Sequence, residues 1–508
     1  METEWSEGRA REAGRPARRD KGGVHVQYEP KSRTRRRSQS PHSSEEASVM
    51  GAERREGREV EGVKDGAAED KPAAVPNGAT QAGEIRARWA WVEPTVWTER
   101  MLAALEQGVK GGKWFSLMDK VYALPNLRAA FAKVRANAGA AGVDRQSVAM
   151  FEQHLDENLK RLAQELRDGR YQPQPVRRKW IAKAGKKNEK RPLGIPTVRD
   201  RVVQTAMRNV LEPIFERQFA VHSYGFRPKR GCKDALRRVV ELLRTGHTYV
   251  VDADLKSYFD TIPHTAMLEE VKRELADGRV LELIEAYMKN SIMDGLEQWE
   301  PEQGTPQGAV LSPLLANIYL DPLDHLMREH GYEMVRYADD FIILCRTEEE
   351  AQRAVEEVRQ WTTQAGLTLH PEKTHIVEAR QPGGFDFLGY HFEKGQRWPR
   401  KKSLEKFKEA IRTKTKRTNG QSLQTIIVTL NRSLQGWFNY FKHSHPRTFA
   451  PLDGWIRMRL RSILRKRHRG RGRGRGKDHL RWPNAYFARH GLFSLATAHA
   501  AACQPSRR

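Results

Sequence analysis

Cysteine and long apolar runs are both scarce in this sequence of 508 residues. Its three cysteines, Cys232, Cys345 and Cys503, are too few and too far apart for a disulfide scaffold or a cysteine-rich zinc site. No run of about 18 apolar residues occurs, so no transmembrane helix is expected. Residues 1–4 lead into no apolar segment, which argues against a secretory signal. These absences predict a soluble protein of a reducing compartment, the cytoplasm, without a membrane partner.

The N-terminal segment lacks the residues that build a core. Residues 1–80 contain no Leu, Ile or Phe, and only 20 of them are apolar. Such a segment cannot bury enough apolar surface to offset its conformational entropy, and its 16 basic and 15 acidic residues nearly cancel. We therefore predict that residues 1–85 are disordered. A mitochondrial transit peptide is an alternative, although such peptides are poor in acids, and an upstream start-codon artefact is another.

Acidic residues are scarce at the opposite end. Residues 401–508 hold 26 Lys and Arg but only 4 Asp and Glu, which accounts for most of the whole-chain net charge of +26. This excess predicts a polyanionic partner, with nucleic acid as the first candidate. Its densest part precedes a Gly-Arg alternation that runs to Gly476 and that we expect to form a flexible loop. Five cations there are predicted to contact phosphates, with a solvated charged surface as the alternative: Arg465, Lys466, Arg467, Arg469 and Arg471.

Between these ends, helices alternate with short strands. Apolar residues recur at helical spacing in residues 155–166, 202–215, 280–292 and 347–365. Residues 248–251 are rich in β-formers and lead to Asp252, and residues 334–337 and 341–345 read as two further strands. Ala338, Asp339 and Asp340 separate the strands at residues 334–337 and 341–345. This spacing predicts a hairpin whose turn carries acidic residues.

Three carboxylates stand at these strand ends. If the strand that ends at Asp254 lies beside the hairpin, then Asp254, Asp339 and Asp340 come together. Three such oxygen donors repel one another unless divalent cations lie among them. Two Mg²⁺ ions about 3.5–4 Å apart can align an attacking 3′-hydroxyl with a leaving pyrophosphate. The alternative is that these acids are ordinary turn residues.

The order of several motifs resembles that of reverse transcriptases. YADD at residues 337–340 resembles their catalytic hairpin, and DADLKSYFD at residues 252–260 resembles their first palm motif. GTPQG at residues 304–308 and LSPLLAN at residues 311–317 look like the segment between these two. RPLGIP at residues 191–196 and SYGFRP at residues 223–228 resemble the fingers motifs, and FLGY at residues 387–390 the closing motif. The combination resembles group II intron reverse transcriptases in particular.

The C-terminal region extends the resemblance. LNRSLQGWFNYF at residues 430–441 is similar to the maturase (X, thumb) domain of intron-encoded proteins, and residues 452–457 and 482–484 continue it. Five of its residues fit a helix face and are expected to be core: Leu430, Leu434, Trp437, Phe438 and Phe441. The resemblance implies an α+β fold. A right-hand polymerase with an antiparallel palm sheet over residues 96–395 would precede a basic helical thumb/maturase domain over residues 396–508.

The resemblance also implies roles for single residues. Asp254, Asp339 and Asp340 would bind the two Mg²⁺ ions, and Lys373 would protonate the leaving pyrophosphate unless it is a simple surface lysine. Phe259 would exclude a 2′-hydroxyl unless it only packs in the core, and Gln307 and Gly308 would line the nascent base pair. Two cations, Lys183 and Arg191, would hold the dNTP triphosphate. Three further lysines of a lengthened loop compete for that role: Lys186, Lys187 and Lys190.

Taken together, the resemblance implies an RNA-directed DNA polymerase encoded by a group II intron and active as a maturase. Its expected partners are the intron RNA, an RNA template with a DNA primer, target DNA and dNTPs, and a second copy of the chain is a further candidate. We expect it in the bacterial cytoplasm, associated with the nucleoid or a ribonucleoprotein. A splicing-only maturase and a domesticated reverse transcriptase in defence or diversification are the alternatives.

One departure from the family pattern concerns DNA cleavage. Many members end in an endonuclease domain with His, Asn and paired cysteines, whereas here Cys503 stands alone after residues 482–484. We therefore expect no endonuclease. Priming would come from a nascent strand or from reverse splicing into accessible DNA.

Overall fold

The computed structural model describes residues 85–109, 111–182 and 190–503. The disorder predicted for residues 1–85 thus falls almost entirely outside the described part. Within it, no helix combines the length and the apolar character that a membrane span needs.

A four-stranded antiparallel sheet, the central sheet, carries the acids. Its strands lie in the order β6 (Glu333–Tyr337), β7 (Asp340–Cys345), β3 (Tyr249–Asp254) and β8 (His375–Glu378). The predicted hairpin is therefore confirmed, and its second strand pairs with the strand that ends at Asp254. Alternate residues of β3 and β7 enter two different apolar cores, as expected for a sheet covered on both faces.

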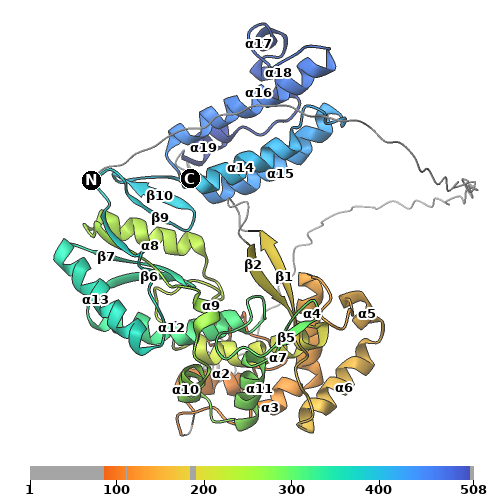
Figure 1. Ribbon diagram of the computed structural model, residues 1–508, viewed down its shortest axis with the longest axis vertical. Helices are drawn as coiled ribbons and strands as arrows, with labels where there is room; N and C mark the ends of the chain where they lie inside the picture. Colours follow the sequence, from red (N-terminus) through yellow and green to blue (C-terminus); the bar gives the residue numbers. More distant parts are fainter. Residues whose placement is uncertain (1–84, 110, 183–189, 504–508) are drawn as a thin grey trace, which may run out of the picture. The chain divides into compact units, whose positions relative to one another are not determined.

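Helices cover one face of the central sheet, where α12 (Ser312–Glu329) and α13 (Glu348–Gln364) lie against it (Figure 1). The helix predicted over residues 347–365 is thus confirmed as α13. The opposite face carries α8 (Cys232–Arg244) and a small sheet of β9 (Phe385–Phe387), β10 (Tyr390–Glu393) and β11 (Gln396–Pro399). The helices next to α12 in the chain complete this region: α9 (Tyr258–Thr261), α10 (His264–Glu274) and α11 (Gly278–Met288).

A second four-stranded sheet, the fingers sheet, has the order β2 (Lys190–Ile195), β1 (Val176–Ala182), β4 (Ile292–Asp294) and β5 (Glu297–Trp299). The helix predicted over residues 280–292 is wrong at its end, because Ile292 pairs with Val176 in this sheet. Long-range strand pairing overrides the local helical pattern there. The surrounding helices are α2 (Glu99–Gln107), α3 (Met118–Tyr122), α4 (Leu124–Asn137), α5 (Val148–Gln153), α6 (Leu155–Arg167) and α7 (Val198–Glu216).

The C-terminal region is helical and has its own core. Leu430, Leu434 and Phe438 of α15 are buried as predicted, Phe441 is buried against the central-sheet side, and Trp437 is half-buried. The helices α14 and α15 contact each other, as do α16 and α19 (Figure 1). The elements are α14 (Lys401–Lys414), α15 (Leu423–Phe441), η1 (Pro446–Thr448), α16 (Phe449–Arg467), α17 (Asp478–Arg481), α18 (Asn484–Arg489) and α19 (Leu495–Cys503).

Candidate active site

The central sheet brings the three predicted carboxylates to one edge. Asp254 and Asp340 are direct partners in the β3–β7 register, and Asp339 precedes Asp340 in the turn. The turn is tight, because Ala338 has a φ of 61°. Among the described residues, no three His, Cys, Asp or Glu side chains are arranged to hold a metal ion. The carboxylates are therefore neighbours without forming a closed ligand set.

Two of these carboxylates, Asp339 and Asp340, lie in a setting that disfavours their charged form. Burial raises the pKa of Asp340 to about 7, and the nearby Asp252, Asp339 and Asp254 contribute. Burial also raises the pKa of Asp339, with Asp254 as the largest charged contributor. Clustered acids of this kind gain from a cation among them, and carboxylate oxygens are ligands that Mg²⁺ prefers. The donor chemistry therefore fits a divalent metal.

Lys373 lies directly beside the carboxylates. It follows a turn that is pinned to β3, where the backbone N–H of His370 donates to the carbonyl of Asp254 at 2.8 Å. The ammonium group of Lys373 forms an ion pair with the Asp254 carboxylate. The lysine singled out in the sequence thus touches one of the three aspartates.

The YADD turn is anchored by a residue that the sequence motifs do not point to. Arg336, which precedes the YADD motif by one residue, is 0% exposed. Its Nε lies 2.8 Å from a carboxylate oxygen of Asp324, and one of its terminal nitrogens donates to the carbonyl of Ala338 at 3.0 Å and to Asn317 at 2.9 Å. A charged residue inside an apolar strand was the available signal, because buried charges are paired.

Asn317 extends this anchor to the fingers motif at residues 223–228. Its side-chain amide donates to the carbonyl of Gly225 at 2.8 Å. A Cβ at Gly225 would lie 2.2 Å from the backbone nitrogen of Ala338, so only glycine permits this approach. Three motifs that are distant in the chain are therefore locked together behind the turn.

The residues predicted to line the nascent base pair lie against the fingers sheet. The N–H of Gly194 in β2 donates to the carbonyl of Gln307 at 2.6 Å. Gly308 approaches the same strand, because a Cβ there would lie 2.5 Å from the carbonyl oxygen of Gly194. A cavity of about 290 Å³ opens here between Gln307, Asp260 and the strand residue Arg178. Gln307 and Gly308 thus line or adjoin a hollow bounded by the fingers sheet.

The structure describes only some of the other residues that are predicted to bind the nucleotide. Phe259 is half-buried, and its ring lies edge-on to that of Tyr258 with 5.4 Å between centroids. Arg191 is exposed in β2, opposite Ile181 of β1, and Lys190 is exposed at the start of β2. Lys183, Lys186 and Lys187 lie outside the described residues.

The predicted RNA-binding cations are divided between a helix and a loop. Arg465, Lys466 and Arg467 form the last turn of α16, and Arg469 and Arg471 follow it. Arg465 is occupied within the protein: its Nε donates to the carbonyl of Arg471 at 2.7 Å, and it pairs with Asp478 at 2.6 Å.

The loop after α16, which the sequence predicts to be flexible, contacts the helix at one glycine and has a hydrogen bond of its own to Asp478. The N–H of Gly474 donates to the hydroxyl of Ser462 at 3.0 Å, and the N–H of Arg475 donates to Asp478 at 3.1 Å. A Cβ at Gly474 would lie 2.5 Å from the Cβ of Arg461. The glycines that suggested flexibility therefore allow close packing at this position.

Comparison with known proteins agrees with this geometry. Residues 181–392 match the family "Reverse transcriptase (RNA-dependent DNA polymerase)", and residues 404–482 match "Group II intron, maturase-specific domain". Protein YkfC of Escherichia coli K12 is 32% identical over 347 residues, which cover 60% of this chain and 85% of that protein. The chain belongs to the group II intron reverse transcriptase/maturase family.

Two further relatives of this reverse transcriptase/maturase are more partial. The group II intron-encoded protein LtrA of Lactococcus lactis is 42% identical over 169 residues, or 33% of this chain and 28% of LtrA. The chain thus matches less than a third of LtrA. A solved partial Cas6-RT-Cas1–Cas2 complex has 26% identity, a TM-score of 0.31, and coverage of 49% of this chain and 41% of that one. The family assignment makes the chain an RNA-directed DNA polymerase by class, with the α+β fold expected from its motifs.

Proposed function

We propose that this chain copies group II intron RNA into DNA and also binds that RNA as a maturase, assisting splicing and target-primed intron mobility. The observation that carries the proposal is the register of β3 and β7, which sets Asp254 opposite Asp340 beside the YADD turn. The proposed domains are fingers and palm over residues 96–395 and thumb/maturase over residues 396–508. The setting we propose is a ribonucleoprotein in a bacterial cytoplasm.

In this proposal Asp254, Asp339 and Asp340 hold two Mg²⁺ ions. When bound, these ions supply charge neutralisation and Lewis acidity for phosphoryl transfer, which depends on positioning more than on covalent chemistry. The raised pKa values of Asp339 and Asp340 support the assignment, because each carboxylate gains when a cation replaces its proton.

The other residues position the substrates. Gln307 and Gly308 line the base pair that forms, and Arg191, with Lys183 or its neighbours, holds the triphosphate. Phe259 excludes the 2′-hydroxyl of a ribonucleotide. Lys373, in its ion pair with Asp254, stands next to the reacting centre and would give its proton to the departing pyrophosphate.

The test is primer extension by the purified full-length chain on an RNA template with a DNA primer, Mg²⁺ and dNTPs. The double variant Asp339→Ala/Asp340→Ala should lower the rate by roughly 1,000-fold or more, because metal sites supply several kcal/mol of transition-state stabilisation. Its affinity for RNA should stay unchanged, since the carboxylates contact no phosphate directly.

A matched control is Glu297→Gln/Glu300→Gln, which removes two exposed acids, one in β5 of the fingers sheet and one directly after it. This variant should extend primers at the wild-type rate. If the wild type binds RNA tightly but never extends a primer, the polymerase part of the proposal fails. The maturase part is then tested by splicing of the intron RNA.

A further inference from the structure

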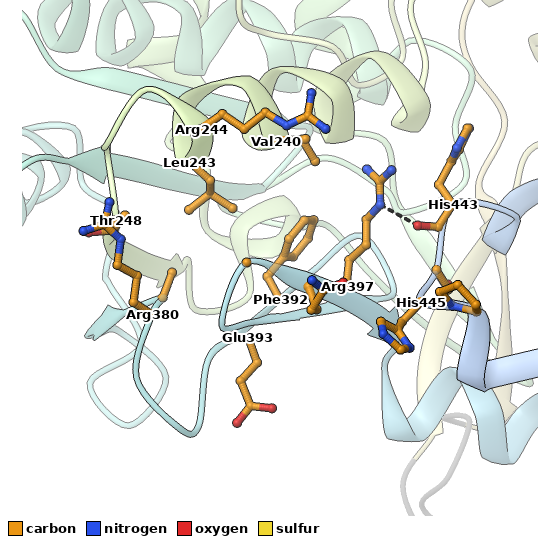
Figure 2. Close-up of a pocket in the computed structure, with 15 residues that line it drawn as sticks. Val240, Leu243, Arg244, Thr248, Arg380, Phe392, Glu393, Arg397, His443 and His445 are labelled. Carbon is orange, nitrogen blue, oxygen red and sulfur yellow. Dashed lines mark hydrogen bonds between the residues drawn. The ribbon is translucent and has the colours of Figure 1, made fainter. Parts of the chain in front are cut away.

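A separate cavity lies at the other end of β3 from Asp254. It has a volume of about 390 Å³, and its lining includes Thr248, which immediately precedes β3 (Figure 2). Asp254 ends the same strand six residues later, roughly 20 Å away at the usual rise of about 3.3 Å per residue. The cavity is therefore distinct from the polymerase site.

The lining of this cavity is strongly cationic. Arg244 and Arg397 both line it, His443 lies beside Arg397, and the side chain of Glu393 points away from the two arginines (Figure 2). Among the described lining residues Glu393 is the one acid, and its carboxylate already accepts from the N–H of Gly383 at 3.0 Å. The Glu393 carboxylate is therefore hydrogen-bonded elsewhere, and it forms no ion pair with either arginine within the described residues.

Helix α8 forms one wall and carries its charge beyond the cavity. Lys233, Arg237, Val240 and Arg244 are spaced four, three and four residues apart, so they share one face of the helix. At about 1.5 Å per residue, this face is roughly 16 Å long. Val240 and Arg244 line the cavity itself, and Lys233 and Arg237 extend the same face of α8 from the cavity towards the start of the helix; we call this cavity and charged face together the α8 groove.

The opposite wall follows the end of α15. The Nε of Arg397 on β11 donates to the carbonyl of His443 at 2.6 Å, which fixes this wall (Figure 2). Burial lowers the pKa of His443, and Arg397, Lys442, Lys233 and Arg237 lower it further. Since Lys233 and Arg237 belong to α8, the two walls are close enough to act on each other across the groove.

Such an arrangement costs self-repulsion that an anion removes. Phosphate groups along a nucleic acid strand would meet cations on both walls, while the half-buried Val240 and Leu243 offer apolar contact to a sugar or base. The cavity volume is in the range that encloses one small ligand, so it admits a single nucleotide and not a duplex.

We propose that the α8 groove, formed by Lys233, Arg237, Val240, Arg244, Arg397, Lys442 and His443, binds a single-stranded RNA segment outside the polymerase site. The inference deepens the proposed function, because RNA is the polyanion that a maturase must hold while it copies. One RNA–protein complex would then have two separate contacts, one in the polymerase site and one along α8.

The test uses full-length protein whose polymerase site is first saturated with unlabelled template–primer. A short fluorescent single-stranded RNA is then titrated at several salt concentrations. The variant is Lys233→Gln/Arg244→Gln/Lys442→Gln. The matched control is Arg328→Gln/Arg353→Gln/Arg359→Gln, which removes three exposed cations from α12 and α13 on the other face of the central sheet.

Wild type and control should bind the second RNA equally well. The groove variant should bind roughly tenfold more weakly, and the slope of log affinity against log salt should be less steep by about 2, at about 0.7 per lost single-strand phosphate contact. The single variant Arg244→Gln should reduce the slope by about 0.7 and guards against a folding defect in the triple variant.

Two results would overturn the proposal: a loaded wild type that binds no second RNA, or a groove variant that matches its control. Displacement of the RNA by an equal concentration of free AMP would also overturn it, since the site would then take free nucleotides and not a strand. Primer extension is measured in parallel. A wild type that fails to extend primers counts against the proposed function alone, whereas the groove variant should extend at the wild-type rate.

Discussion

In the central sheet the charged side chains are buried or half-buried, whereas in the C-terminal helices most of them are exposed. Arg336 is fully buried and has specific partners in Asp324, Asn317 and the Ala338 carbonyl. Lys466, Arg469 and Arg471 in the C-terminal region are exposed. The same type of side chain thus fixes geometry in one region and supplies a charged surface in the other.

The contrast also runs within the C-terminal region itself. Arg461 is 2% exposed, with its Nε donating to the carbonyl of Trp482 at 2.8 Å and a terminal nitrogen donating to Asn484 at 2.8 Å. It lies among cations that are open to solvent. Charge density in a sequence therefore does not distinguish an arginine that holds the fold from one that is free to meet a phosphate, and burial and partners do.

The largest expected effect tests the enclosed side of this comparison. Arg336→Met should cost about 3–5 kcal/mol of unfolding free energy, because it leaves Asp324 buried without its partner. The double variant Arg336→Met/Asp324→Leu should recover most of that stability, since an apolar pair replaces the ion pair. Chemical denaturation of wild type, both single variants and the double variant measures this coupling.

Measuring primer extension separates two roles of Arg336, which are stabilising the fold and positioning the YADD turn. The double variant still lacks the donor to the Ala338 carbonyl and to Asn317, so its kcat for primer extension should stay low while its stability returns. Arg336→Lys keeps the charge and should recover part of both. A stable double variant with wild-type kcat would show that Arg336 only stabilises the fold and does not position the YADD turn.

The residues around the YADD turn also show which parts of the candidate site can be predicted from the sequence. Asp339 and Asp340 could be placed together because the two strands and the turn between them are local signals, whereas Asp254 joined them only on the condition that its strand lies beside the hairpin, which the structure meets. Arg336 was missed because its partner Asp324 lies on α12, and nothing in the sequence links the two.

Long-range pairing explains the other differences. The helix expected to reach residue 292 stops at Met288, because Ile292 joins Val176 in the fingers sheet. The α8 groove brings Lys233 near Lys442 and His443, which are some two hundred residues away in the chain. Periodicity identifies each element but cannot show which faces meet.

A smaller loss of stability is expected when the buried Arg461 of the C-terminal region is replaced. Arg461→Met should destabilise the chain by about 1–3 kcal/mol, because it leaves the Trp482 carbonyl and Asn484 without their donor. It should leave the salt dependence of RNA binding unchanged, since Arg461 is buried.

The comparison variant is Lys466→Gln/Arg469→Gln/Arg471→Gln. It should change stability by no more than about 0.5 kcal/mol per site, while the salt slope of RNA binding falls by about 2. Thermal unfolding and RNA titration of both variants give the result. If Arg461→Met lowered the slope as much as the triple variant did, burial would not separate structural from binding arginines here.

The last effect depends on pH and concerns the acids of the central sheet in metal-free protein. Burial and the neighbouring carboxylates raise the pKa of Asp340 to about 7 from its ordinary value of 3.8. The folded state therefore holds this proton more tightly than the unfolded chain does, so the contribution of Asp340 to stability falls as pH rises from about 4 to about 7 and is lowest above that range. Asp340→Asn removes the charge and should remove this loss.

Melting temperatures measured in EDTA test whether the contribution of Asp340 to stability falls as the pH rises. The excess of the Asp340→Asn melting temperature over that of the wild type should be larger at pH 8 than at pH 5, whereas Glu297→Gln, an exposed acid of β5, should show no such pH-dependent excess. Added Mg²⁺ should then raise the wild-type melting temperature more than that of Asp340→Asn, because only the wild type keeps the full set of carboxylates. An excess that is the same at both pH values would mean that Asp340 does not experience the burial and repulsion that set it apart from the exposed charges of the C-terminal helices.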